Sequence, residues 1–129
     1  MLPARAFAVA GQLTRAIADA DADALERLYV PTAIIWHSTD QVEMTLQEVL
    51  NLLKAIGKVA DCTVDVTGTM LTERGFVQTQ RNTYTFRDGR STFFHAALVV
   101  TLNAEGRILR LEEYLDSAGL GPLVAAMSP

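Results

Sequence analysis

Four runs with the period of β-strands fill the second half of the chain and constrain its fold more than any other feature. Rich in Val, Thr, Phe and Tyr, these runs cover residues 62–71, 76–86, 92–102 and 108–115. Short connections around Gly75, Gly89 and Gly106 separate them. Connections of this length favour hairpins, so we expect the four strands to form an antiparallel meander.

The first half of the chain has the periodicity of helices. Apolar residues recur at helical spacing within residues 7–17, 25–29 and 46–53. The segment 32–38, which follows Pro31, predicts a short strand between the second and third helices. Helices that come first and strands that come later predict an α+β fold, and we expect residues 1–129 to form one domain.

Two of these helices begin at sequences that resemble capping boxes. Thr45 is followed by Glu48, and Asp23 is followed by Glu26. In such a box the first side chain accepts a hydrogen bond from the helix backbone, and the acidic side chain reaches back to the capping residue. We therefore expect Thr45 and Asp23 to cap helices, while residues 118–127 could form a short closing helix or strap.

Charge and composition argue against several classes of partner. The chain has 11 Lys and Arg residues against 15 Asp and Glu residues, and its basic residues are scattered, so nucleic acid is not an expected partner. Two histidines, one cysteine and no glycine-rich phosphate loop give no reason to expect a metal or another cofactor. The single Cys62 excludes an intrachain disulfide and the N-terminal segment lacks the pattern of a secretion signal, so we expect a cytoplasmic protein. No apolar run reaches the ~18 residues that span a bilayer, so we expect no membrane contact.

His37 ends a short apolar strand, directly after Trp36. An imidazole has an unperturbed pKa of about 6.5, so it can accept a proton from an acidic carbon near neutral pH. His37 could instead cap the end of the strand and hydrogen-bond to a loop carbonyl. The sequence leaves both interpretations open, and we take His37 as the first candidate for a catalytic base.

Arg81 and Glu113 are charged residues on strands that are otherwise rich in threonine or leucine. Alternation along each strand places Arg81 on one face with Thr83, and Glu113 on one face with Leu111. A buried carboxylate without a partner is costly, so we expect Arg81 to pair with Glu113. The pair could be structural, or Glu113 could act as a base while Arg81 orients it or stabilises developing negative charge.

Seven further residues could line a cavity for a small apolar organic ligand, although such side chains are also common in protein cores. They are Tyr29, Trp36, Met70, Thr83, Phe94, Leu98 and Leu111. The strand at 92–102 is apolar on both faces, and the face that carries Phe93 and His95 needs its own cover. Since helices are expected on the other face, we predict a homodimer through this convex face.

The order helix, helix, short strand, helix and four-stranded meander resembles the nuclear transport factor 2-like superfamily. The segment ALERLYVPTAIIWH is similar to the one that enters the pocket in ketosteroid isomerases and SnoaL-like polyketide cyclases. The segment GRILRLEEYLD is similar to the last strand of SnoaL-like proteins and limonene epoxide hydrolase. The resemblance implies a curved antiparallel sheet wrapped around three N-terminal helices into a cone with an open mouth.

The resemblance also implies roles for single residues. His37 falls where ketosteroid isomerases keep their general-base aspartate, and Leu98 stands near the position of their protonated aspartate. Arg81 and Glu113 match two members of the triad of limonene epoxide hydrolase, and Thr83 replaces the third.

These roles imply cofactor-independent acid/base chemistry on a small apolar carbonyl or polycyclic compound. The reaction would be that of an isomerase, a cyclase, a dehydratase or a hydrolase. The alternative from a different class is a module that binds a small ligand, or mediates dimerisation, without catalysis.

Overall fold

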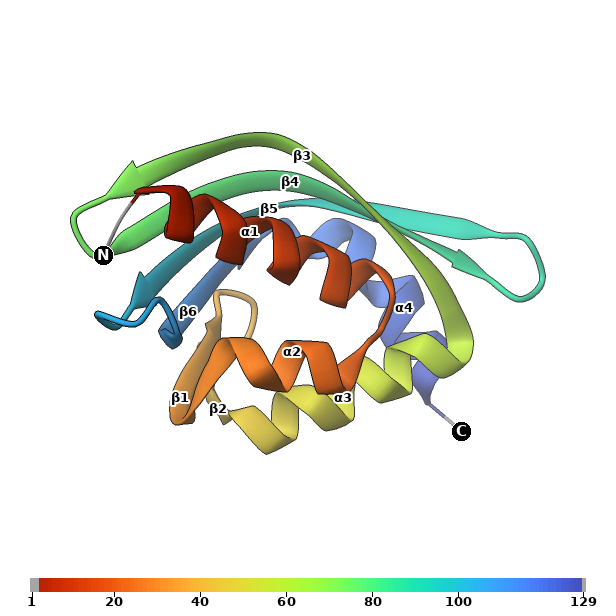
Figure 1. Ribbon diagram of the computed structural model, residues 1–129. Helices are drawn as coiled ribbons and strands as arrows, with labels where there is room; N and C mark the ends of the chain where they lie inside the picture. The colour runs from red at the N-terminus through yellow and green to blue at the C-terminus, as the bar shows by residue number, and fades with distance from the viewer. Residues whose placement is uncertain (1–2, 129) are drawn as a thin grey trace.

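A curved sheet that arches over a layer of helices dominates the structure (Figure 1). The computed structural model describes residues 3–128. In chain order the elements are α1 (Pro3–Ala18), α2 (Ala22–Leu28), β1 (Tyr29–His37), β2 (Glu43–Thr45), α3 (Leu46–Val59), β3 (Ala60–Thr72), β4 (Gly75–Phe86), β5 (Ser91–Leu102), β6 (Ile108–Leu115), the 3₁₀ turn η1 (Ser117–Gly119) and α4 (Leu120–Met127). The predicted α+β fold is confirmed.

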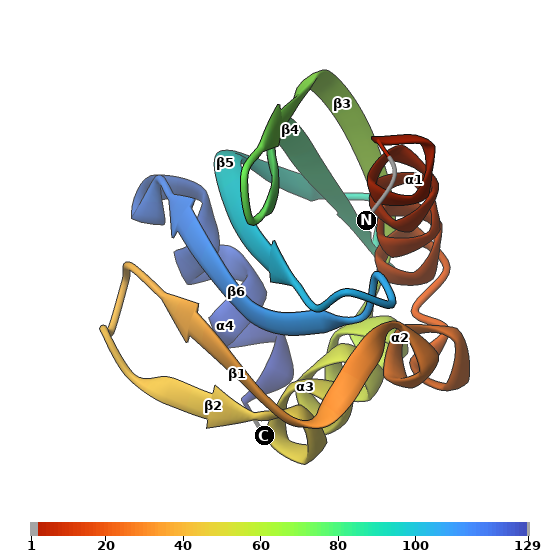
Figure 2. The same cartoon turned by 60° about the vertical axis from the view of Figure 1, so that its left-hand side comes forward.

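The strands form one sheet in the order β2-β1-β6-β5-β4-β3. Strands β3 to β6 pair as antiparallel neighbours, which confirms the predicted meander. The sheet is mixed rather than wholly antiparallel, because β1 lies parallel to β6 (Figure 2). A parallel pair needs a long crossover, and here the chain between the two strands runs through α3 and the first three strands of the meander. The three residues of β2 are too few to show a period in the sequence.

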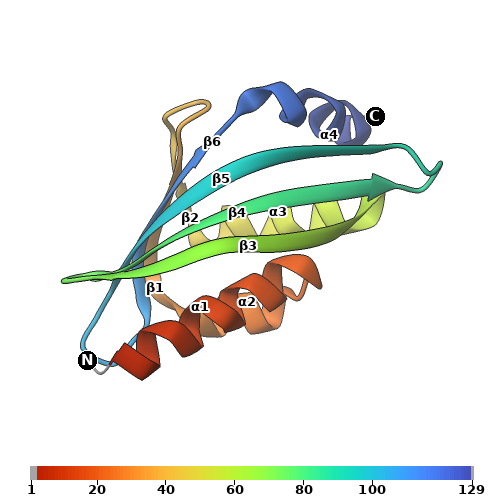
Figure 3. The ribbon, with the colours of Figure 1, turned by 90° about the horizontal axis from the view of Figure 1, so that it is seen from above.

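A fourth helix joins the three that the first half of the chain predicts. The helices α1, α2 and α3 lie beneath the arch of the sheet, as Figure 1 shows. The helix α4 contacts α3 and β5, on the side of the molecule away from α1 (Figure 3). Residues 120–127 therefore form the closing helix, and the 3₁₀ turn η1 leads into it. Among residues 3–128, no helix is long and apolar enough to cross a membrane.

One of the two expected helix caps is confirmed and the other is wrong. The Thr45 Oγ1 accepts a hydrogen bond from the Glu48 backbone N–H at 3.2 Å, and the Glu48 carboxylate accepts one from the Thr45 N–H at 3.1 Å. At the start of α2 the cap is Asp21, whose carboxylate accepts from the Ala24 N–H at 3.1 Å, and not Asp23. The chain turns sharply after α1, with a φ of 50° at Ala20, so the next helix begins earlier than predicted.

The core fills the space between the concave face of the sheet and the helices. Val9 and Leu13 of α1 pack there with Phe76 of β4, and all three are fully buried. A second group of buried side chains, which includes Tyr84 and Phe94, packs against α4. Tyr84, Phe94 and Leu123 of this second group also line the cavity that holds the candidate site.

Candidate functional site

An apolar cavity of about 400 Å³ opens on the concave side of the sheet, between the strands, α3 and α4. The helices contribute Val49, Leu52 and Ile56 from α3, and Leu123, Val124 and Met127 from α4. Among these apolar walls the cavity holds a small set of polar groups, which include His37, Glu113 and Tyr29. A mostly apolar pocket of this size with few convergent polar groups is typical of a site for a small organic molecule.

His37 and Glu113 meet on one wall of the cavity. The His37 Nε2 lies 3.2 Å from the Glu113 Oε1, and the two side chains are 18% and 16% exposed. They are register partners in the parallel pair of β1 and β6, so both point to the same side of the sheet. The Ser38 N–H donates to the Glu113 carbonyl at 2.9 Å and fixes the strand ends beside them. The fold thus joins two residues that are far apart in the sequence.

The Glu113 carboxylate contributes to the pKa shifts of other groups that line the cavity. The hydrogen bond to Glu113 raises the pKa of His37, burial works against this rise, and the nearby Asp40 carboxylate adds to it. Burial and the charge of Glu113 also raise the pKa of Tyr29, so its hydroxyl keeps its proton. The surroundings of His37 therefore stabilise its protonated form, the imidazolium.

This raised pKa of His37 makes the stability of the fold depend on pH. A histidine whose folded pKa lies above its unfolded value stabilises the fold fully below about pH 6.5, and that stabilisation is lost as the pH rises through the folded pKa. As the pH rises through this window, we expect the free energy of unfolding of the parent protein to fall more than that of a His37→Gln variant. Urea unfolding across the window measures the difference, and NMR titration of His37 gives the pKa. An NMR midpoint at or below the ordinary histidine value would contradict the prediction.

The structure places four of the seven predicted ligand-binding residues in the cavity wall. These four are Tyr29, Phe94, Leu98 and Leu111. Leu98 is the register partner of Glu113 on β5, so its side chain lies next to the His37 and Glu113 pair. The strand alternation predicted from the sequence holds at Phe94, Leu98 and Leu111. Tyr29 was expected at the end of a helix, whereas it begins β1.

The other three predicted ligand-binding residues do not line the cavity. Trp36 points to the outer face of the sheet, where its ring lies 5.3 Å from that of Tyr114, because its neighbour His37 faces inward. Thr83 also faces outward, in register with Phe93. Met70 lies near the far end of β3 with 56% of its surface exposed. These three assignments are corrected.

Arg81 does not pair with Glu113, contrary to the prediction. Its neighbour in β4, Asn82, lines the cavity, so alternation sends Arg81 to the outer face. There the guanidinium carbon lies 3.8 Å from the centre of the Phe93 ring. The partner of Glu113 is His37 instead. A catalytic role for Arg81 in this cavity is therefore abandoned.

An Arg81→Ala substitution is expected to change little. It removes an exposed contact between a cation and a ring, which contributes about 0.5–1 kcal/mol. Truncating a buried ion pair would instead cost about 3–5 kcal/mol. Chemical unfolding of the variant distinguishes these outcomes, and a loss in the larger range would contradict the placement of Arg81 on the outer face.

Sequence reasoning missed the polar groups that β4 and the loop after β1 bring to the cavity. Asn82 and Tyr84 line it from β4, and Thr39 and Asp40 line it from the loop. The sequence did not reveal which face of β4 points inward, because that face carries amides where a core strand usually carries apolar residues. Within the described residues, no group of His, Cys, Asp and Glu side chains is arranged to hold a metal ion.

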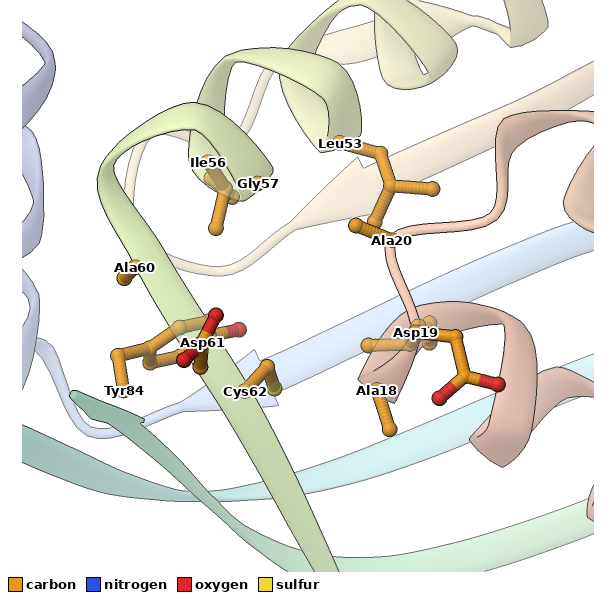
Figure 4. Close-up of a pocket in the computed structure, with 11 residues that line it drawn as sticks. Ala18, Asp19, Ala20, Leu53, Ile56, Gly57, Ala60, Asp61, Cys62 and Tyr84 are labelled. Atoms are coloured by element: carbon orange, nitrogen blue, oxygen red, sulfur yellow. The ribbon is translucent and has the colours of Figure 1, made fainter. Parts of the chain in front are cut away.

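A second cavity of about 320 Å³ adjoins the first, between the ends of α1 and α3 and the start of β3. Figure 4 shows Leu53 and Ile56 entering it from α3, with Tyr84 and Cys62 near β3. Leu53, Ile56 and Tyr84 line both cavities, and so does Ile17. The two spaces therefore share a wall that includes the Tyr84 ring.

Comparisons with known proteins give similarity in structure. No family model and no curated protein sequence matches the chain. The structure is similar to that of a candidate SnoaL-like polyketide cyclase from Shewanella putrefaciens, with a TM-score of 0.78, 12% identity, and coverage of 97% of this chain and 98% of that one. It is similar to an LEH-like epoxide hydrolase of M. tuberculosis, with a TM-score of 0.77, 11% identity, and coverage of 95% and 90%.

A third solved structure comes from Catenulispora acidiphila and has a ketosteroid isomerase-like fold in complex with trimethylamine. Its TM-score is 0.77 at 10% identity, with coverage of 94% of this chain and 96% of that one. At such identities the similarity shows the fold alone, and this fold agrees with the resemblance seen in the sequence. The chain therefore has the nuclear transport factor 2-like fold that SnoaL-like and ketosteroid isomerase-like proteins share.

Proposed function

We propose that the protein transfers protons on a small, largely apolar carbonyl or polycyclic compound without a cofactor. The observation that carries this proposal is the His37 and Glu113 pair, held at 3.2 Å in the wall of an apolar cavity. An acid/base group in such surroundings acts on a substrate from which much of the water has been removed, and its charge interactions are stronger there than in water.

The geometry supports different roles for His37 and Glu113. When the His37 Nε2–H donates to the Glu113 carboxylate, the Nδ1 of neutral His37 holds a free lone pair. That nitrogen can accept a proton from the carbon next to a carbonyl group, and Glu113 stabilises the imidazolium that results. Return of the proton to another carbon gives isomerisation. Attack by the enolate carbon on a second carbonyl gives cyclisation, and the imidazolium then returns its proton to the alkoxide that forms.

Glu113 could itself be the base, with His37 orienting it. The two assignments differ in the pH dependence of the reaction. If His37 is the base, the rate rises with pH through the raised pKa of His37, and a Glu113→Gln change moves that rise to lower pH because the main cause of the shift is gone. If Glu113 is the base, the Glu113→Gln variant is inactive at every pH.

Deuterium exchange tests the proposal without knowledge of the natural substrate. We expect the protein to catalyse incorporation of deuterium into α-tetralone, an apolar bicyclic ketone with one enolisable carbon, in heavy water. NMR follows the loss of the α-proton signal, and a protein-free sample gives the background rate. Binding of such ketones without any catalysed exchange would contradict the proposal and favour the ligand-binding alternative.

The homodimer predicted from the sequence also stays a proposal. The outer face of the sheet presents Phe93 and Tyr114, each nearly half exposed, and this exposure supports cover by a second chain. Sedimentation equilibrium measures the mass of the assembly in solution.

A further inference from the structure

Three buried amide side chains follow one another along the inner face of β4. Gln78, Gln80 and Asn82, here called the amide ladder, are only 2%, 2% and 3% exposed. Burying an amide is costly unless its donors and acceptors are used, so the hydrogen bonds of the ladder determine which way each amide points. The ladder ends at Tyr84, the next inward residue of the strand.

The direction of the ladder is fixed at its first member. The Thr14 Oγ1 of α1 donates its hydrogen to the Ala10 carbonyl at 3.1 Å, so towards Gln78 it can only accept. Gln78 therefore presents its Nε2 to Thr14, at 2.9 Å. The Thr69 hydroxyl donates to the Gln78 Oε1 at 3.0 Å and agrees with this orientation.

The orientation is passed on along the strand. The Gln78 Nε2 donates to the Gln80 Oε1 at 3.0 Å, and the Gln80 Nε2 donates to the Asn82 Oδ1 at 2.7 Å. The Asn82 Nδ2 then donates to the Tyr84 hydroxyl at 3.3 Å. The Tyr84 oxygen is thus an acceptor in the ladder, and its own hydrogen is left for another partner.

Tyr84 is held in place with this hydrogen available. Its ring stacks on Phe94, with 5.7 Å between the ring centres and 29° between their planes. Its register partner on β3 is Cys62, whose sulfur is at best a weak acceptor for this hydrogen. Burial above all, with a contribution from the charge of Glu113, raises the pKa of Tyr84, so the hydroxyl keeps its proton. Tyr84 lies in the wall of both cavities, where a better acceptor could replace the sulfur.

We infer that Tyr84 is the hydrogen-bond donor for the oxygen of the ligand, and that the cavity selects ligands with a carbonyl-type acceptor over hydrocarbons of the same shape. The choice of a carbonyl compound rests on the proposed function, but the binding step needs no catalysis. The amide ladder acts through Tyr84, because it occupies the phenol oxygen as an acceptor and thereby directs the hydrogen away from Asn82.

Paired affinities test this inference. We expect the parent protein to bind α-tetralone about tenfold more tightly than tetralin, which lacks the oxygen, as one net hydrogen bond implies. Tyr84→Phe should bring the ratio to about one while the affinity for tetralin is kept. Tyr114→Phe is the matched control, since the Tyr114 hydroxyl donates to Glu112 on the outer face, and its ratio should stay tenfold. A ratio that survives in Tyr84→Phe, or a parent ratio near one, overturns the inference.

A spectroscopic readout on the parent protein covers the case in which Tyr84→Phe does not fold. A hydrogen bond from Tyr84 lowers the carbonyl stretching frequency of bound α-tetralone relative to the ketone in an alkane. A frequency equal to that in the alkane overturns the inference.

The test separates failure of this inference from failure of the proposed function. A tenfold affinity ratio without α-proton exchange supports the donor role of Tyr84 and contradicts proton transfer by His37 and Glu113. Catalysed α-proton exchange with an affinity ratio near one contradicts the donor role of Tyr84 and supports proton transfer by His37 and Glu113. His37→Gln should lose the exchange and keep the ratio.

Discussion

His37→Gln is expected to reduce the catalysed deuterium exchange of α-tetralone by about a hundred- to ten-thousandfold, the usual contribution of a positioned general base. The Gln side chain keeps a donor for the Glu113 carboxylate but has no nitrogen that can accept a proton near neutral pH. The rate is followed by NMR at saturating ketone, and the affinity for the ketone is measured in parallel.

His95→Gln provides the matched control for this prediction. His95 is exposed on the outer face and does not line the cavity. The centres of its ring and the Phe93 ring lie 6.0 Å apart, with 90° between the ring planes. Loss of exchange in the His37 variant together with parental exchange in the His95 variant locates the chemistry in the cavity. Equal rates in the two variants would show that His37 is not the base.

Gly119→Ala is expected to destabilise the fold by about 1–3 kcal/mol, as overpacking does, and to weaken ligand binding. The φ of −85° at Gly119 suits any residue, so the need for glycine comes from a close approach. A Cβ at this position would lie 1.8 Å from the Phe93 carbonyl oxygen. Relief of that clash has to move the chain that leads into α4, and α4 supplies part of the cavity wall.

Gly11→Ala is a suitable comparison for this second prediction. Gly11 lies within α1, and the nearest atom to an added Cβ is the end of the Arg15 side chain at 3.9 Å. Alanine should stabilise this helix by roughly 0.5–1 kcal/mol without an effect on binding. Thermal unfolding and ketone titration of both variants measure the contrast. Parental stability of Gly119→Ala would mean that α4 is not held as closely to β5 as described.

The sequence predicted the meander because its strands follow a period of two, and it predicted the inward position of Phe94 and Leu98 for the same reason. It could not predict the pair of His37 and Glu113, since no local pattern reveals that β1 lies parallel to β6. That pairing depends on how the whole chain between the two strands folds. The position of this cavity wall therefore depends on the strand order, which no local pattern in the sequence reveals.

The errors at Arg81 and Thr83 have a common physical origin in β4. The inner face of this strand carries Gln78, Gln80 and Asn82, so its polar residues are not a guide to the solvent side. Amides can be buried there because each accepts one hydrogen bond and donates at least one. From the sequence alone, the face with threonines looked like the inner one.

A crystal structure of the protein soaked with α-tetralone tests the central claim most directly. The account predicts ketone density in the cavity between the sheet, α3 and α4, with the carbonyl oxygen within hydrogen-bond distance of the Tyr84 hydroxyl and the α-carbon facing His37. Density elsewhere on the molecule, or a ketone in the cavity that contacts neither His37 nor Tyr84, would contradict it.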